Sequence, residues 1–178
     1  MPFTPYHFGP SGFVGLVFRK WIDMPVFVLA NVAVDIEVLL LMLFDPGSSA
    51  HRYAHTLVFG AVVGALWGLA AHPCRPVFAR CMRLLRLPYE TSLRKMVLSG
   101  ILGAWLHVII DSLYHADVRL SWPSKPIGLR DMAHWHLRER RVKYACLLFF
   151  CAAAVVYVAA VVKRRRHQAT DPPPAEGS

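Results

Sequence analysis

The chain has 178 residues, of which 56% are hydrophobic, and its mean hydropathy is +0.40. This is more apolar surface than one small soluble core can hide, so the composition argues against a water-soluble domain. The formal net charge of +9 could indicate a nucleic-acid partner, but the basic residues flank apolar blocks without forming a recognition motif, so we expect contacts with membrane lipids and no nucleic acid.

A short amphipathic helix is expected near residues 11–21, and four apolar blocks of membrane-spanning length follow it. The blocks cover residues 24–44, 54–71, 98–113 and 144–162, and the last ends in the basic run 163–166. We therefore predict an all-α, polytopic membrane helical bundle with about four transmembrane helices plus a short N-terminal half-helix. Residues 1–166 would form this membrane-embedded domain, and residues 167–178 a disordered Pro-rich tail.

The basic residues between the blocks also predict an orientation. The connector 72–95 holds six Lys and Arg residues against a single acidic residue, Glu90. Connectors rich in Lys and Arg remain in the cytoplasm, which puts both termini on the cytoplasmic side. The connector 119–143, rich in Trp, Pro and Arg, is expected to lie at the headgroup level.

Histidines and carboxylates recur at four-residue intervals near the ends of two blocks. His51 and His55 are four apart at the start of the second block, so on a helix they would share one face, at a spacing suited to metal binding. His107 and Asp111 repeat the interval in the third block, and His115 continues the stripe. Because these blocks run in opposite directions, both pairs should reach the same side of the membrane.

The first block carries two carboxylates, Asp35 and Glu37, midway along an otherwise apolar segment. Residues two apart on a helix face nearly opposite ways, so we expect Asp35 to point inward and Glu37 to face a polar groove or stay protonated. A helix rising from Arg19 and Lys20 gains about 1.5 Å per residue, which could lift His7 to the depth of Asp35. This N-terminal segment would then be re-entrant.

Imidazole nitrogens combined with carboxylate oxygens fit zinc best, with manganese or iron behind it. One divalent metal would use three or four of these groups, and two metals could use all six: His7, Asp35, His51, His55, His107 and Asp111. Such a site can lower the pKa of a bound water to roughly 7 and so supply hydroxide for hydrolysis. Asp35, Asp111 and His115 are the candidate catalytic residues, as ligand or proton carriers.

Two other interpretations of the same residues stay open. The cluster could be a hydrogen-bond network that locks helices together, or it could handle ions or protons in a membrane transport protein. The remaining histidines we interpret mainly as interfacial or packing residues: His72, His134, His136 and His167. The glycines within the second and third blocks most simply allow close helix approach: Gly60, Gly64, Gly68, Gly100 and Gly103.

Four segments of the sequence together carry a resemblance to a known protein family. They are MPFTPYH at the start, NVAVDIE in the first block, HRYAHT before the second and LHVIIDSLY at the end of the third. Together, over roughly residues 1–126, they resemble the YdjM-like membrane-bound metal-dependent hydrolases, a bacterial and archaeal group. The resemblance implies an inner-membrane helical protein with a divalent metal bound by His7, Asp35, His55, His107 and Asp111, with His51 as an additional candidate.

The order of these residues is also distantly similar to that in zinc-dependent phospholipase C and related nucleases. The chain departs from that pattern at His134, because Arg138 rather than a carboxylate lies four residues later. A complete three-metal site is therefore not expected. The leading hypothesis is a membrane-bound hydrolase that uses metal-activated water on a lipid-like ester or phosphoester, with its site open toward the outer half of the bilayer.

Overall fold

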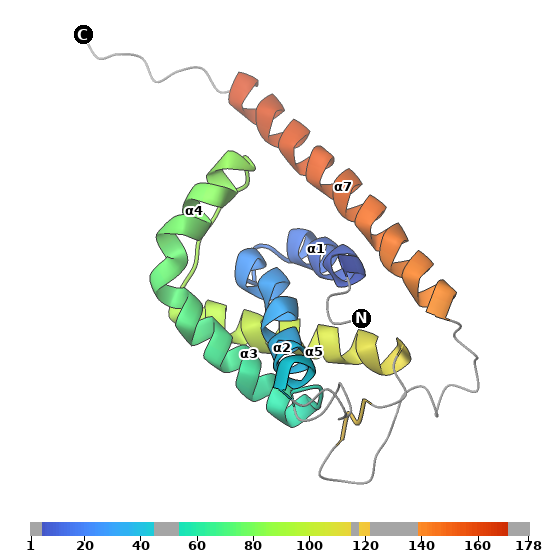
Figure 1. Ribbon diagram of the computed structural model, residues 1–178. Coiled ribbons are helices and arrows are strands. Elements are labelled where there is room, and N and C mark those ends of the chain that lie inside the picture. The colour runs from blue at the N-terminus through green and yellow to red at the C-terminus, as the bar shows by residue number, and fades with distance from the viewer. Residues whose placement is uncertain (1–4, 45–53, 115–117, 122–138, 171–178) are drawn as a thin grey trace.

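The computed structural model describes residues 5–44, 54–114, 118–121 and 139–170 (Figure 1). Every regular element in this part of the chain is a helix, and four helices are long and apolar enough to cross a membrane. The predicted all-α bundle with a short N-terminal helix is confirmed. These four apolar helices are compatible with a multi-pass membrane protein.

The elements follow one another along the chain with short connections. In order they are η1 (Pro5–His7), α1 (Phe8–Val17), α2 (Met24–Phe44), α3 (Leu57–Ala71), η2 (His72–Cys74), α4 (Arg75–Leu84), α5 (Leu93–Tyr114) and α7 (Glu139–Thr170). The α2 helix has the bounds predicted for the first apolar block. The short first helix begins at Phe8 and ends at Val17, so the expected range of 11–21 lay too far along the chain.

Local capping explains where two helices begin. Thr56 accepts a hydrogen bond from the Phe59 backbone N–H at 3.2 Å, so α3 begins at Leu57 rather than at residue 54. Ser92 accepts one from the Lys95 backbone N–H at 3.2 Å, and α5 begins at Leu93, five residues before the predicted apolar block. Apolar composition marks the length of a helix that could span a membrane, whereas the capping side chain marks where the helix begins.

The last helix is longer than predicted. α7 continues through the basic run to Thr170, so residues 167–170 are helical where a disordered tail was expected. The sequence 163–169 contains no Gly or Pro, and the first proline after it is Pro172, which disfavours helical backbone in the residue before it. The rest of the predicted tail, residues 171–178, lies outside the described residues.

Glycines bring α3 and α5 into close antiparallel contact. A Cβ atom on Gly64 would lie 2.4 Å from the Gly100 carbonyl oxygen, and one on Gly68 would lie 2.6 Å from the Val97 Cα. Neither approach leaves room for a side chain. The prediction that these glycines serve helix packing is confirmed.

The α2 and α5 helices run in the same chain direction and cross each other in a fixed register. The matched positions advance by four residues in both helices: Asp23 with Ser99, Phe27 with Gly103, and Asn31 with His107. A Cβ on Gly103 would lie only 2.3 Å from the Phe27 carbonyl oxygen, so a glycine is required at this crossing. One turn further along each helix, the same register brings Asp35 to the level of Asp111.

The α1 helix lies between α2 and α7 and contacts both (Figure 1). A Cβ on Gly9 would lie 2.2 Å from the Cys146 carbonyl oxygen, so α1 approaches α7 at backbone distance. This contact anchors the start of α1 against the bundle. It thereby fixes the position of His7, two residues earlier.

Candidate metal centre

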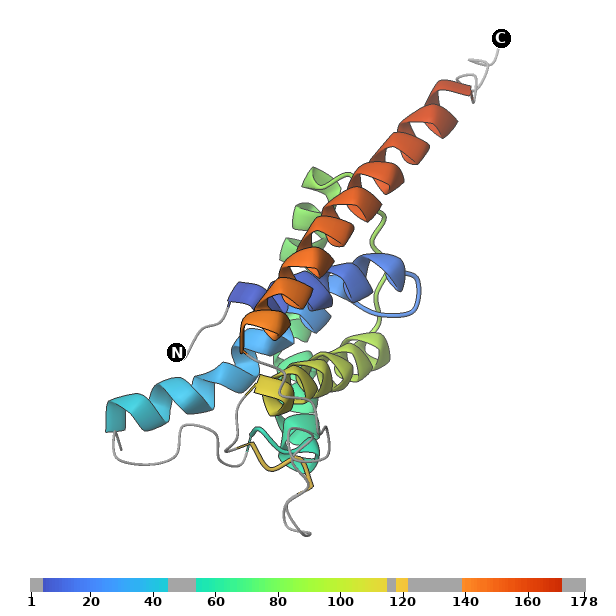
Figure 2. The same ribbon diagram turned by 90° about the vertical axis from the view of Figure 1, so that its right-hand side faces the viewer.

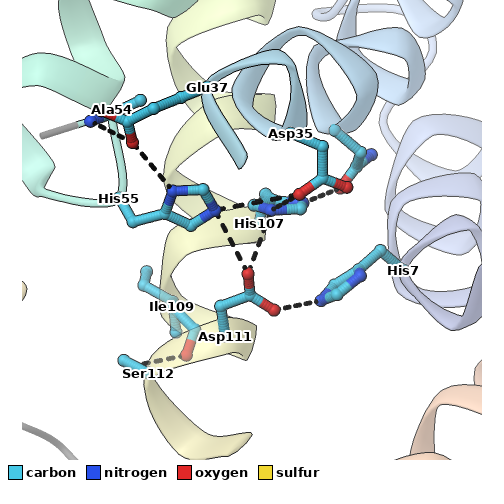
Figure 3. A network of polar contacts seen from close by, with 10 residues as sticks. His7, Asp35, Glu37, Ala54, His55, His107, Ile109, Asp111 and Ser112 are labelled. Atoms are coloured by element: carbon cyan, nitrogen blue, oxygen red, sulfur yellow. Dashed lines mark hydrogen bonds and ion pairs between the residues drawn. The ribbon is translucent and has the colours of Figure 1, made fainter. Parts of the chain in front are cut away.

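Four buried side chains from three segments meet inside the bundle. Asp35 comes from α2, His55 from the turn before α3, and His107 and Asp111 from α5. One ligand atom from each lies within 4.8 Å of the others, a grouping that could hold a metal ion. Figure 3 shows these side chains pointing toward one another. The expectation that the second and third blocks bring their polar residues together is confirmed for His55 with His107 and Asp111, whereas His51 lies outside the described residues.

Two imidazole nitrogens and two carboxylate oxygens face a common space. His107 Nε2 lies 3.3 Å from Asp35 Oδ1 and 3.2 Å from Asp111 Oδ2. His55 Nε2 lies 3.8 Å and 3.4 Å from the same two oxygens. His55 and His107 are fully buried, so water does not screen these groups.

The geometry at His107 Nε2 is informative about what this space can hold. Although both carboxylates are close, no group among the described residues makes a hydrogen bond of ordinary angle to this nitrogen. The nitrogen is therefore directed between the two carboxylates instead of at either one. A buried nitrogen without a well-directed hydrogen bond is unfavourable, and a cation bound among these groups would give it a partner.

The Nδ1 atoms of His55 and His107 are held by other side chains. His55 Nδ1 lies 3.4 Å from Glu37 Oε2, and His107 Nδ1 lies 3.3 Å from Asn31 Oδ1. The Asn31 amide is itself oriented, because its Nδ2 donates to the Val28 carbonyl at 2.6 Å. Metal-binding histidines usually make such a hydrogen bond through the nitrogen that does not bind the metal. Both rings are thus turned with Nε2 toward the centre.

Glu37 takes part in the centre, contrary to the prediction that it would face away. Its Oε2 contacts His55 Nδ1 and also accepts the Ala54 backbone N–H at 2.9 Å. Asp35 and Glu37 do point to different sides, but His55 lies in a turn and its ring sits between the two carboxylates (Figure 3). The offset between Asp35 and Glu37 was correctly inferred, but the prediction that His55 lies on a helix was wrong, because α3 begins only at Leu57.

His7 lies beside the four-residue group. Its Nε2 is 2.9 Å from Asp111 Oδ1, the carboxylate oxygen on the side away from the two central histidines (Figure 3). The ring packs against that of His107 with centroids 4.5 Å apart, and Ser11 donates to the His7 carbonyl at 2.7 Å. The structure therefore brings the amino-terminal segment to this centre, as the rise of the first helix suggested.

Asn31 contacts His107 but was not among the residues predicted for the site. A signal for Asn31 was present, since it precedes Asp35 by four residues and so shares its helix face. Of the other histidines, His72 lies outside the cluster, 3.3 Å from an Arg75 guanidinium nitrogen, and His167 falls on α7. Four predicted or candidate histidines lie outside the described residues: His51, His115, His134 and His136.

The donor set suits a divalent metal. Two imidazoles and two carboxylates without a thiolate are a combination that zinc, manganese and iron all accept. Burial of Asp35 and Asp111 favours a bound cation for a second reason, because two carboxylates close together in a low-dielectric site repel each other.

Comparisons of this chain with protein-family models, with curated proteins and with solved structures found no match. The resemblance to the YdjM-like hydrolases thus stays an expectation that rests on the four sequence segments.

Proposed function

We propose that this protein is a membrane-bound metal-dependent hydrolase that cleaves a lipid-like ester or phosphoester. The observation that carries the proposal is the orientation of the two central histidines. Their Nε2 atoms face Asp35 and Asp111, while Glu37 and Asn31 hold their Nδ1 atoms. A network that only locked helices together would not require every nitrogen to be oriented in this way.

In this proposal Asp35, His55, His107 and Asp111 hold a divalent cation, most simply zinc. Such a cation supplies Lewis acidity and makes water nucleophilic near neutral pH. Asp111 faces the centre through Oδ2, which would hold the cation, and its Oδ1 lies 2.9 Å from His7 Nε2, so it would orient His7 beside the site, where an imidazole can hold or release a proton. His115 stays a candidate proton carrier on the grounds of its sequence position.

The surroundings of the centre support a lipid-like substrate. Beyond Val38, the last turns of α2 carry exposed apolar side chains and no charged residue: Leu39, Leu40, Met42, Leu43 and Phe44. This part of α2 extends away from the other helices (Figure 2). A substrate with an acyl or prenyl chain could pack there while its polar bond reached Asp35, about one to two turns earlier on the same helix.

The proposed setting is the cytoplasmic membrane of a bacterium or archaeon, with both termini in the cytoplasm. The excess of Lys and Arg around α4 and at the end of α7 supports this orientation. The centre would then belong to the outer half of the bilayer. Its substrate could reach it sideways from the lipid phase.

The proposal is tested by measuring bound metal and hydrolysis in the same preparations. Purified wild-type protein should contain a divalent metal by elemental analysis, and His107→Ala should lose both the metal and hydrolysis of ester and phosphodiester lipids in mixed micelles. His72→Ala is the matched control, because His72 lies outside the centre, and it should behave as wild type. Full hydrolytic activity after the metal has been stripped would refute the proposal.

The same protein in sealed vesicles separates hydrolysis from transport. We expect lipid cleavage without uptake of labelled zinc or of protons. Uptake that depends on His107, with no cleavage of any lipid tested, would assign the centre to ion handling and overturn the hydrolase.

A further inference from the structure

A second polar site lies at the other end of the molecule. A cavity of about 490 Å³ opens between the end of α4, the segment that follows it and the last third of α7. Its walls include four arginines and two apolar residues: Arg83, Arg86, Arg164, Arg165, Leu87 and Val161. Figure 2 shows α4 and the carboxyl-terminal part of α7 at this end.

The cavity is remote from the metal centre. Cys146 of α7 lies at the level of Gly9, close to His7, and Arg164 follows Cys146 by 18 residues along the same helix. At 1.5 Å per residue this separation is about 27 Å, close to the thickness of the hydrocarbon core of a bilayer. The cavity and the metal centre therefore lie toward opposite ends of the bundle.

The four guanidinium groups bring positive charge together at one place on the surface. Within the described ranges, no Asp or Glu forms an ion pair with any of them. Arg164 donates to the Arg86 carbonyl oxygen at 2.9 Å, which ties α7 to the segment after α4 and leaves most of its N–H donors available. All four arginines are exposed, and arginine does not lose its proton in proteins, so a bound anion would reduce their mutual repulsion beyond what solvent screening does.

The backbone at Arg86 shows that an arginine is held here against local preference. Its φ is 57°, in the left-handed region, and it occupies the position after a helix end where glycine is usual. Leu87 N–H bonds to the Met82 carbonyl and Arg86 N–H to the Arg83 carbonyl, both at 2.9 Å, the pattern of a Schellman motif. A non-glycine residue with this backbone conformation is often found at a functional site, so the Arg86 guanidinium is a candidate for ligand binding.

The combination of charge and apolar wall indicates the class of ligand. Arginine forks match phosphate oxygens in paired hydrogen bonds, and Leu87 and Val161 offer apolar contact next to them. The basic residues of α7 directly follow its apolar span, where lipid headgroups are found. We propose that this cavity binds the phosphate group of an anionic phospholipid headgroup.

Replacing Arg86 by glycine separates ligand binding from folding. Arg86→Gly removes one guanidinium but supplies the residue that the left-handed backbone favours, so the fold should be kept or slightly stabilised. In nanodiscs of phosphatidylcholine with added phosphatidylglycerol, we expect the full-length variant to retain phosphatidylglycerol roughly tenfold less well than wild type by native mass spectrometry, because one charge-assisted contact is lost. Arg165→Gln should have the same effect.

The control and a competitor complete the test. Arg80→Gln removes an exposed arginine of α4 that does not line the cavity, and it should leave phosphatidylglycerol retention unchanged. Equal weakening by Arg80→Gln would mean diffuse attraction between charged surfaces, and unchanged retention by Arg86→Gly and Arg165→Gln would mean that the cavity binds no headgroup; either result overturns the proposal. Inorganic phosphate binding that is lost in Arg86→Gly and Arg165→Gln, with phosphatidylglycerol retention unchanged in both variants, would assign the cavity to a free phosphate and refute the lipid ligand.

Discussion

The Gly103→Ala substitution tests whether helix spacing controls the metal centre without altering any of its ligands. Gly103 lies one turn before His107 on α5, at the crossing with α2. A Cβ there would be 2.3 Å from the Phe27 carbonyl oxygen and 2.8 Å from the Ala30 Cβ. Both neighbours lie on α2, and the nearer one is backbone, so no flexible side chain can move aside.

The expected displacement can be worked out from these contacts. Ordinary contact requires more than 3 Å, so α2 and α5 must separate by about 1 Å at this level. Asn31 and Asp35 lie one and two turns further along α2 and would move with it, away from His107. Bonds to zinc are near 2.0–2.2 Å and tolerate only about 0.2 Å of misplacement, so a shift of this size should break at least one of them.

We therefore expect Gly103→Ala to lower metal affinity by roughly tenfold to a hundredfold, as loss of a supporting contact does at other metal sites. Overpacking should also lower the free energy of unfolding by about 1–3 kcal/mol. Metal titration followed by elemental analysis measures the first effect, and thermal unfolding in detergent measures the second.

The matched control is Gly12→Ala. A Cβ on Gly12 would meet only the Ala153 Cβ, at 4.0 Å, so this change should be neutral in both assays. If Gly103→Ala bound metal as tightly as wild type, the inference that the α2–α5 distance positions the ligands would be wrong.

Three further outcomes are expected. Glu37→Ala should weaken metal binding roughly tenfold to a hundredfold in a titration, because His55 loses the contact that orients its ring, and unchanged affinity would speak against that role. Removal of metal by a chelator should lower the free energy of unfolding by about 2.7 kcal/mol relative to protein in free metal at about 100 times the Kd. Identical melting curves with and without the metal would exclude binding to the folded state. Burial and the hydrogen bond to Asp23 raise the pKa of Tyr89 above its usual value, so the folded state holds this proton more tightly than the unfolded state does. Stability should therefore fall as the pH rises above about 10, and the decline should be shallower in Tyr89→Phe; equal slopes would contradict it.

Much of the fold could be predicted from the sequence alone. Stretches of apolar residues report directly on spanning length, and α2 has the bounds that its stretch predicted. Four-residue spacing also identified His107 and Asp111 as neighbours on one helix face, and they lie 3.2 Å apart between Nε2 and Oδ2. These features are local, because they depend on the helical period and on the composition of a single segment.

Relations between segments required the tertiary structure. Backbone contact at Gly103 and the pairing of Asn31 with His107 set the register of α2 on α5, and nothing within either segment determines how two helices slide along each other. Glu37 joins the centre only because the chain turns at His55 before α3 begins.

The arginine cavity depends on the same kind of information. Arg86 and Arg164 are 78 residues apart, yet a hydrogen bond joins them across the space between two helices. The sequence by itself determined which apolar segments would be helical and which residues within such a segment share a face. Only packing between helices, decided by side-chain volume at their crossings, determined which of those faces would meet.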